Sequence, residues 1–109
     1  LFRSGIVEQV DLQGIFLGTD LKLPHRETRF RIEPGDKILL LTDGYLEQDN
    51  VDEDLLDYNR CKAYFAAAAH LPVEELLDQM LESFETWKDG VDQRDDVTLI
   101  VLEAKSVSN

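Results

Sequence analysis

The chain has 109 residues, of which 43% are hydrophobic and 31% are charged, and its formal net charge is −12. The length suits a single soluble domain, and the longest apolar runs, such as residues 63–69, are far too short to cross a bilayer. The negative charge would repel a phosphate backbone, which argues against nucleic-acid binding.

The N-terminal part of the chain carries the weakest structural signals. A turn is predicted at Ser4-Gly5 and a short strand over residues 6–12, although two of its seven positions break the alternating pattern. Gly14 and Gly18 then bracket a short apolar segment. Residues 28–33 alternate between charged and uncharged side chains, which predicts a half-buried strand with the local basic residues on its solvated face.

The middle of the chain predicts a turn followed by a buried strand. Pro34-Gly35-Asp36 has the composition of a turn, because proline fixes one φ angle and glycine permits a positive one. Residues 37–42 are apolar on both faces, so we expect a strand that is covered on both sides. This strand is predicted to stop at Asp43-Gly44.

Two helices are expected next. Residues 43–57 hold seven acidic side chains and no basic ones, which predicts a solvated loop that leads into a helix N-terminus. The first helix is expected over residues 55–69. The second is expected to begin at Pro72 and to end at Asp89-Gly90. Its apolar residues follow the helical period: Val73, Leu76, Leu77, Met80, Leu81, Phe84 and Trp87.

Carboxylates stand at the ends of two apolar strands. Asp43 leaves the strand of residues 37–42, and Asp95-Asp96 stands at the start of a final strand expected over residues 96–103. In an antiparallel sheet the end of one strand can lie beside the start of its neighbour, so Asp43 and Asp95 could converge. Carboxylates about 4 Å apart repel by roughly 4 kcal/mol at an effective dielectric near 20, and a hard divalent cation would remove this repulsion. The alternative interpretation is a plain turn and a solvated loop, because neither motif is specific by itself.

Both motifs resemble those of a known family. Residues 32–47, from Ile32-Glu33-Pro34-Gly35-Asp36 through Thr42-Asp43-Gly44 to Glu47, are similar to the signature of PPM-type protein phosphatases. The closest branch is the one typified by sporulation stage II protein E, whose terminal strand resembles Arg94-Asp95-Asp96-Val97-Thr98.

This resemblance implies an α+β fold, specifically part of an αββα sandwich in which two antiparallel sheets lie between layers of helices. It also implies a centre of two Mn²⁺ or Mg²⁺ ions that activates water to attack phosphoserine or phosphothreonine. Carried over by position, Asp43 and Asp95 resemble metal ligands, whereas Gly44 and Asp96 would support the site.

One departure from the family pattern concerns the other metal ligands. The N-terminal half of such domains supplies an acidic residue and an Asp-Gly pair, and no Asp-Gly pair precedes Asp43 here. We therefore expect residues 1–109 to be the C-terminal portion of one phosphatase domain, with the N-terminal half of the fold absent. The chain alone is expected to be inactive, and an uncovered sheet face would favour self-association.

The expected function is thus that of a part of a bacterial phosphatase. The resemblance implies a phosphorylated regulatory protein as substrate and partner, such as an anti-sigma factor antagonist. The alternative is a degenerate, non-catalytic domain that serves as a partner-binding or dimerisation module. A single-site Ca²⁺ module is disfavoured because residues 43–57 lack the spacing of a helix-loop-helix calcium loop.

The remaining notable side chains are expected to have structural or surface roles. Cys61, the only cysteine, and Trp87 lie on apolar helix faces and are predicted to be buried, whereas His25 and His70 are predicted to lie on the surface. Glu47 is close to the first motif but is not assigned to the site. A single cysteine permits no intrachain disulfide, and no signal-peptide pattern is present, so we expect a cytoplasmic protein.

Overall fold

The structure, a computed structural model, describes residues 1–9 and 31–106. Its strands and helices are β1 (Phe2–Arg3), β2 (Ile6–Val7), β3 (Lys37–Leu41), α1 (Asp43–Leu46), α2 (Asp57–Ala68), α3 (Val73–Lys88) and β4 (Leu99–Glu103). The described part of the chain holds no helix with the length and apolar character that a bilayer crossing requires.

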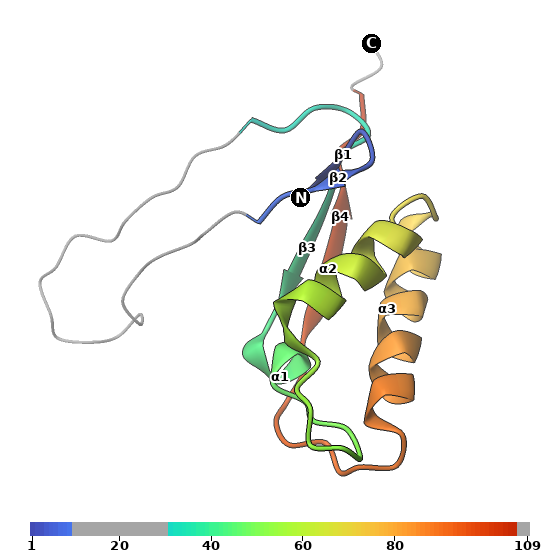
Figure 1. Cartoon of the computed structure of the whole chain (residues 1–109). Helices are drawn as coiled ribbons and strands as arrows, with labels where there is room; N and C mark the ends of the chain where they lie inside the picture. The colour runs from blue at the N-terminus through green and yellow to red at the C-terminus, as the bar shows by residue number, and fades with distance from the viewer. Residues whose placement is uncertain (10–30, 107–109) are drawn as a thin grey trace, which may run out of the picture.

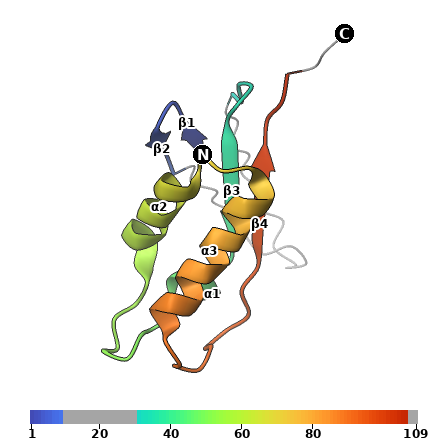
Figure 2. The same cartoon turned by 90° about the vertical axis from the view of Figure 1, so that its right-hand side faces the viewer.

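The strands form one antiparallel sheet in the order β2-β1-β3-β4. The main pair is β3 with β4, which stay in register from Lys37 opposite Glu103 to Leu41 opposite Leu99. Helices α2 and α3 lie together on one face of this pair (Figures 1 and 2). The predicted α+β class is confirmed, and a sheet with one helical layer agrees with part of an αββα sandwich.

The hydrophobic core lies between the sheet and the two long helices. Leu76, Met80 and Phe84 project from α3 at helical spacing, while Cys61 and Phe65 project from α2. The core also contains Tyr45, Leu56, Ala68 and Ala69. From the sheet, Leu39, Leu41, Leu99 and Val101 pack against this core. Alternate strand residues therefore supply one face of the core, as the period of two requires.

The opposite face of the sheet is apolar but open. Leu40, Ile100 and Leu102 are 41%, 47% and 48% exposed, and Ile32 adds to the exposed apolar surface nearby. We predicted that the strand of residues 37–42 would be covered on both sides, but within residues 1–9 and 31–106 only the helix-facing side is covered. The strand of residues 37–42, which is apolar on both faces, therefore lies in a sheet that the described residues cover with helices on one face only.

Several predicted boundaries shift in the structure. Residues 31–33, expected in a strand, have no regular secondary structure, and the rest of that predicted strand, with His25, Gly14 and Gly18, lies outside the described residues. The strand expected over 6–12 is formed only at Ile6–Val7, and its residues 10–12 are likewise not described. The first helix begins at Asp57 rather than at Leu55.

The ends of α3 follow the predicted signals. Pro72 is the residue that precedes the helix, and Asp89 ends it in a left-handed conformation with φ 42°, followed by Gly90 with φ 85°. One apolar residue of the predicted face, Leu81, is 42% exposed instead of buried. Its helical position therefore lies at the edge of the apolar stripe, beyond the width that the sheet covers.

A partly buried ion pair joins the N-terminal hairpin to the predicted Pro-Gly-Asp turn. Gly35 adopts φ 92° in this turn, and the backbone N–H of Asp36 donates to the carbonyl oxygen of Glu33 (3.0 Å). The side chain of Asp36 is buried and accepts hydrogen bonds from Arg3 Nε (3.1 and 3.0 Å) and Nη2 (2.6 Å). The hydrogen bonds from Arg3 are the main cause of the lowered pKa of Asp36.

Lys37, next to this ion pair, ties β3 to the end of α2. Its side chain is buried, and Nζ donates to the carbonyl oxygens of Ala69 (2.6 Å) and Leu71. These carbonyl groups lie just after α2, where a helix leaves backbone acceptors without intrahelical partners and where positive charge is favoured. The cation therefore fixes the sheet against the α2–α3 connection.

Candidate functional site

The structure brings the two acidic motifs together at one end of the β3–β4 pair. Beyond the last paired residues, the backbone N–H of Thr42 donates to the carbonyl oxygen of Thr98 (3.1 Å), and the N–H of Thr98 donates to the hydroxyl oxygen of Thr42 (3.0 Å). Thr42 precedes Asp43, and Thr98 follows the Asp95-Asp96 pair. The predicted convergence of the two segments thus rests on strand pairing and on one threonine side chain.

Gly44 allows this close approach. It is buried, and a β-carbon at this position would collide with the backbone carbonyl group of Asp96 and would touch the side chain of Val97. The glycine therefore lets α1 pack directly on the backbone of the second motif. The space beside Gly44 is thus filled by the backbone of Asp96 and the side chain of Val97.

The three predicted acidic residues are exposed at this end of the sheet. Asp43 is the first residue of α1, a helical turn that the sequence analysis interpreted as loop. Asp95 and Asp96 lie in the segment before β4, where Asp95 Oδ1 accepts a 2.7 Å hydrogen bond from the N–H of Asp96. This bond ties one oxygen of Asp95 to the local backbone and orients the carboxylate.

These carboxylates fit the donor chemistry of Mn²⁺ or Mg²⁺ but do not make a complete site. Oxygen ligands are those that hard divalent cations prefer. Among residues 1–9 and 31–106, no group of three or more His, Cys, Asp or Glu side chains is placed to hold a metal ion. The two acidic segments therefore do not form a metal site by themselves among the described residues.

Gln48 could not be predicted as part of the surroundings of the site, although the structure places it in contact with the loop before Asp95. Its side chain is fully buried and forms hydrogen bonds with the segment that leads to Asp95. Nothing in the sequence marks this glutamine, which stands in the acidic stretch that we interpreted as a solvated loop.

Arg94 and Asp49 make a second connection between the same loops. Arg94 Nε donates to Asp49 Oδ1 (2.9 Å) and Nη2 donates to Oδ2 (3.2 Å), a two-pronged ion pair. The hydrogen bond from Arg94 is the main cause of the lowered pKa of Asp49, and the same bond raises the pKa of Arg94. The acidic stretch is thus partly neutralised by the residue that precedes Asp95.

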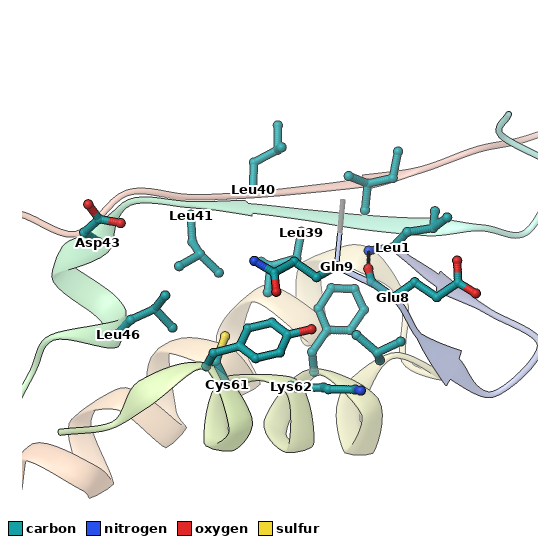
Figure 3. Close-up of a pocket in the computed structure, with 14 residues that line it drawn as sticks. Leu1, Glu8, Gln9, Leu39, Leu40, Leu41, Asp43, Leu46, Cys61 and Lys62 are labelled. Atoms are coloured by element: carbon teal, nitrogen blue, oxygen red, sulfur yellow. Dashed lines mark hydrogen bonds between the residues drawn. The ribbon is translucent and has the colours of Figure 1, made fainter. Parts of the chain in front are cut away.

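A pocket of about 280 Å³ opens between β3 and α2, beside Asp43 (Figure 3). Leu39 and Leu41 point into it from β3, whereas Leu40 points to the opposite face of the sheet. Its lining also includes Leu1, Val7, Glu8, Gln9, Ile38, Leu46, Tyr58, Cys61, Lys62 and Phe65. Asp43 is part of the lining, but Asp95 and Asp96 are not, so the pocket adjoins only one side of the site.

The other residues singled out in the sequence play structural roles. Cys61 is buried as predicted, and burial raises the pKa of its thiol to about 11. Trp87 is partly buried against the core, and its Nε1 donates to the carbonyl oxygen of Gln48 (2.9 Å). His70 is exposed, as predicted, and Glu47 is exposed next to α1.

Comparison with known proteins gives one family. Residues 1–105 match the family described as Stage II sporulation protein E (SpoIIE), which is nearly the whole chain. No curated protein and no solved structure matches the chain significantly.

Proposed function

Because this chain belongs to the stage II sporulation protein E family, we propose that it forms the C-terminal portion of a PPM-type phosphatase domain that hydrolyses phosphoserine or phosphothreonine in proteins. The observation that carries the proposal is the meeting of the Thr42-Asp43-Gly44 and Asp95-Asp96 motifs at one end of β3 and β4. The family match and the order of the motifs point to the same chemistry.

Asp43 and Asp95 would hold Mn²⁺ or Mg²⁺ in the intact domain. Both carboxylates are exposed where β3 ends and where the approach to β4 begins, so they face solvent from which a hydrated ion can enter. When bound, a pair of such ions supplies an activated water and neutralises charge on the phosphoryl group. Asp96 would support the site through its backbone, which contacts Asp95, Thr42 and Gly44.

The chain alone should lack hydrolytic activity. Two-metal chemistry requires a clamp on the attacking and the leaving oxygens, and two carboxylates from these motifs do not provide it. The open sheet face and the edge of β3 support the idea of a larger domain. Only Lys37 of β3 is paired with β1, so the β1 side of residues 38–41 has no strand partner among the described residues.

A phosphorylated regulatory protein, such as an anti-sigma factor antagonist in the bacterial cytoplasm, is the substrate that the family resemblance favours. The charge of the chain fits a protein substrate better than a nucleic acid, because −12 disfavours a polyanion. The competing proposal is a non-catalytic module that binds a partner or a second copy. The observation that favours this alternative is the exposed apolar face formed by Leu40, Ile100 and Leu102.

The decisive experiment is Mn²⁺-dependent hydrolysis of a phosphoserine peptide by three proteins. These are the present chain, the chain extended upstream to the natural length of its gene product, and the extended form with Asp43→Ala. Asp78→Ala, a change of an exposed carboxylate on α3, is the matched control in the extended form. Activity confined to the extended protein and its control supports the proposal, whereas inactivity of every form with several metals and substrates favours the binding module.

A further inference from the structure

We infer that Gln48 is a positioning residue for Asp95, an inference that rests on the proposed function of the site. Gln48 lies five positions after Asp43, and its side-chain hydrogen bonds go to Asp49, Asp92 and Arg94 rather than to the carboxylates that would hold metal. It acts on the backbone of the segment that delivers Asp95. Its role is to hold this segment at a fixed place relative to α1.

The side-chain amide of Gln48 binds both ends of a short backbone segment. Nε2 donates to the carbonyl oxygen of Asp92 (3.0 Å), and Oε1 accepts from the N–H of Arg94 (3.2 Å). Nε2 also donates to the carbonyl oxygen of Asp49 (3.1 Å) and to Asp49 Oδ1 (3.4 Å). Both polar atoms of the amide are therefore in use, and two of these four bonds cross to the loop that precedes Asp95.

The backbone of Gln48 is held as firmly as its side chain. Its carbonyl oxygen accepts hydrogen bonds from Trp87 Nε1 (2.9 Å) and from the N–H of Leu56 (2.9 Å). The guanidinium group of Arg60 lies over the ring of Trp87, 4.5 Å from its centre, and holds the indole from the other side. Gln48 is thus bound to Trp87 of α3 and to Leu56 before α2. Its side chain then holds the loop of residues 92–94 against these two elements.

Because Gln48 is fully buried, its hydrogen bonds favour a single position of the loop before Asp95. A primary amide withdrawn from water loses its hydration, so its place in the core is favourable only when all its hydrogen bonds are made. Gln48 is fully buried, and the bonds to Asp92 and Arg94 form in a single position of the loop. Any displacement of the loop leaves a buried polar group unpaired, which penalises alternative positions of Asp95.

The second motif is consequently held on both sides by one short segment of chain, and the Arg94–Asp49 ion pair and the contacts of Asp96 with Thr42 and Gly44 add to these ties. Thr42 binds Thr98 on one side of the motif, and Gln48 binds Arg94 on the other. Between these anchors lie only Asp95, Asp96 and Val97. Loss of the Gln48 anchor should loosen Asp95, which then depends on the remaining ties, while leaving Asp43 in place, because Asp43 belongs to α1 directly after β3.

The test compares Gln48→Met, which keeps the length of the side chain but removes its hydrogen bonds, with Gln79→Met on the exposed face of α3. Leu76→Ala, a core change away from the loop, controls for a general loss of stability. Amide hydrogen exchange of residues 92–97 and broadening of amide NMR signals by Mn²⁺ are measured on the full chain. If Gln48→Met does not fold, Gln48→Asn, which shortens the reach of the amide, takes its place.

We expect at least about a tenfold faster exchange at Arg94 than in Leu76→Ala after correction for global stability, since several hydrogen bonds to a buried group are lost. Broadening at Asp43 should persist, while broadening at Asp95 and Asp96 should fall in Gln48→Met but not in Gln79→Met. Unchanged exchange, or equal loss of broadening at Asp43 and Asp95, overturns the role of Gln48. An absence of broadening at both motifs in the unmodified chain counts against the proposed metal site, and hydrogen exchange alone then decides whether Gln48 positions the loop.

Discussion

The hydroxyl oxygen of Thr42 accepts a 3.0 Å hydrogen bond from the backbone N–H of Thr98 and so joins the residue before Asp43 to the segment that carries Asp95 and Asp96. The N–H of Thr42 returns a 3.1 Å bond to the carbonyl oxygen of Thr98. The two motifs are therefore connected by hydrogen bonds that involve no carboxylate. Substitutions can loosen the site without touching a proposed ligand.

Thr42→Val tests this connection because it keeps the branched shape of the side chain but removes the acceptor. We expect a loss of about 0.5–1.5 kcal/mol in the free energy of unfolding, mainly from the bond with Thr98, because the hydroxyl's other hydrogen bond, to the carbonyl oxygen of Asp96, is long at 3.5 Å. Thr42→Ser retains the hydroxyl group and should be closer to the unmodified chain. Urea unfolding followed by circular dichroism measures both, and equal stability of the two variants would contradict the role of the hydroxyl.

The change in stability caused by Gly44→Ala shows whether helix propensity or the contact with Asp96 dominates at this position. Gly44 lies within α1, where helix propensity alone predicts that alanine stabilises by about 1 kcal/mol. The contact with the backbone of Asp96 predicts the opposite, a loss of about 1–3 kcal/mol from overpacking. Denaturant unfolding decides the sign, and a more stable variant would show that the two motifs do not touch in this way.

The ion pair of Arg3 and Asp36 should make stability depend on acid pH. The hydrogen bonds from Arg3 are the main reason that the pKa of Asp36 in the folded chain lies below its ordinary value of 3.8. A group with a lowered folded pKa stabilises the fold above its unfolded pKa and loses this effect as the pH falls through the folded value. The urea midpoint should therefore decline below about pH 4, and Asp36→Asn should show a smaller decline there. Asp78→Asn on α3 is the control, and an equal decline in Asp36→Asn would refute the assignment.

Cys61 should react slowly with alkylating reagents in the folded chain. Burial raises the pKa of its thiol to about 11, and the thiolate is the reactive form. We expect mass spectrometry to show little modification by iodoacetamide at about pH 8 and rapid modification after unfolding in urea. Rapid labelling of the folded chain would mean that α2 opens readily or that the thiol reaches solvent through the adjoining pocket.

The open face of the sheet should make the chain self-associate. Exposed Leu40, Ile100 and Leu102 form an apolar surface, while the charge of −12 opposes contact between copies. Association should therefore strengthen with added salt, which screens the repulsion. Sedimentation equilibrium of Leu40→Thr/Ile100→Thr should show weaker association than Leu81→Thr on α3, and no difference between these variants would exclude the sheet face as the contact.

Strand β3 and helix α3 could be predicted because the spacing of their apolar residues determines which faces are buried. The apolar run that becomes β3 and the helical period of Leu76, Met80 and Phe84 in α3 determine which faces are buried. Antiparallel pairing then places Asp43 near the second motif, as the sequence suggested. The main elements therefore followed from local patterns and the meeting of the motifs from antiparallel pairing, whereas the fold class was implied by the family resemblance.

The supporting residues could not be predicted because their environment comes from distant segments. Gln48 stands among acidic residues, where a polar side chain is ordinarily solvated, and only contacts with residues 92–94 bury it. The pairing of Asp49 with Arg94 likewise depends on two loops that meet after α2 and α3 have packed. The helical turn α1 was missed because Asp43-Gly44 has the composition of a simple turn.

The separation of the two motifs along the chain has a kinetic consequence. Thr42 and Thr98 are 56 positions apart, and the whole α2–α3 hairpin lies between them. Closing so long a loop is entropically costly, so β3 and β4 should pair only after the intervening helices have collapsed. The acidic end of the sheet is then among the last parts to assemble, and a cation that bridges Asp43 and Asp95 would slow unfolding rather than speed folding.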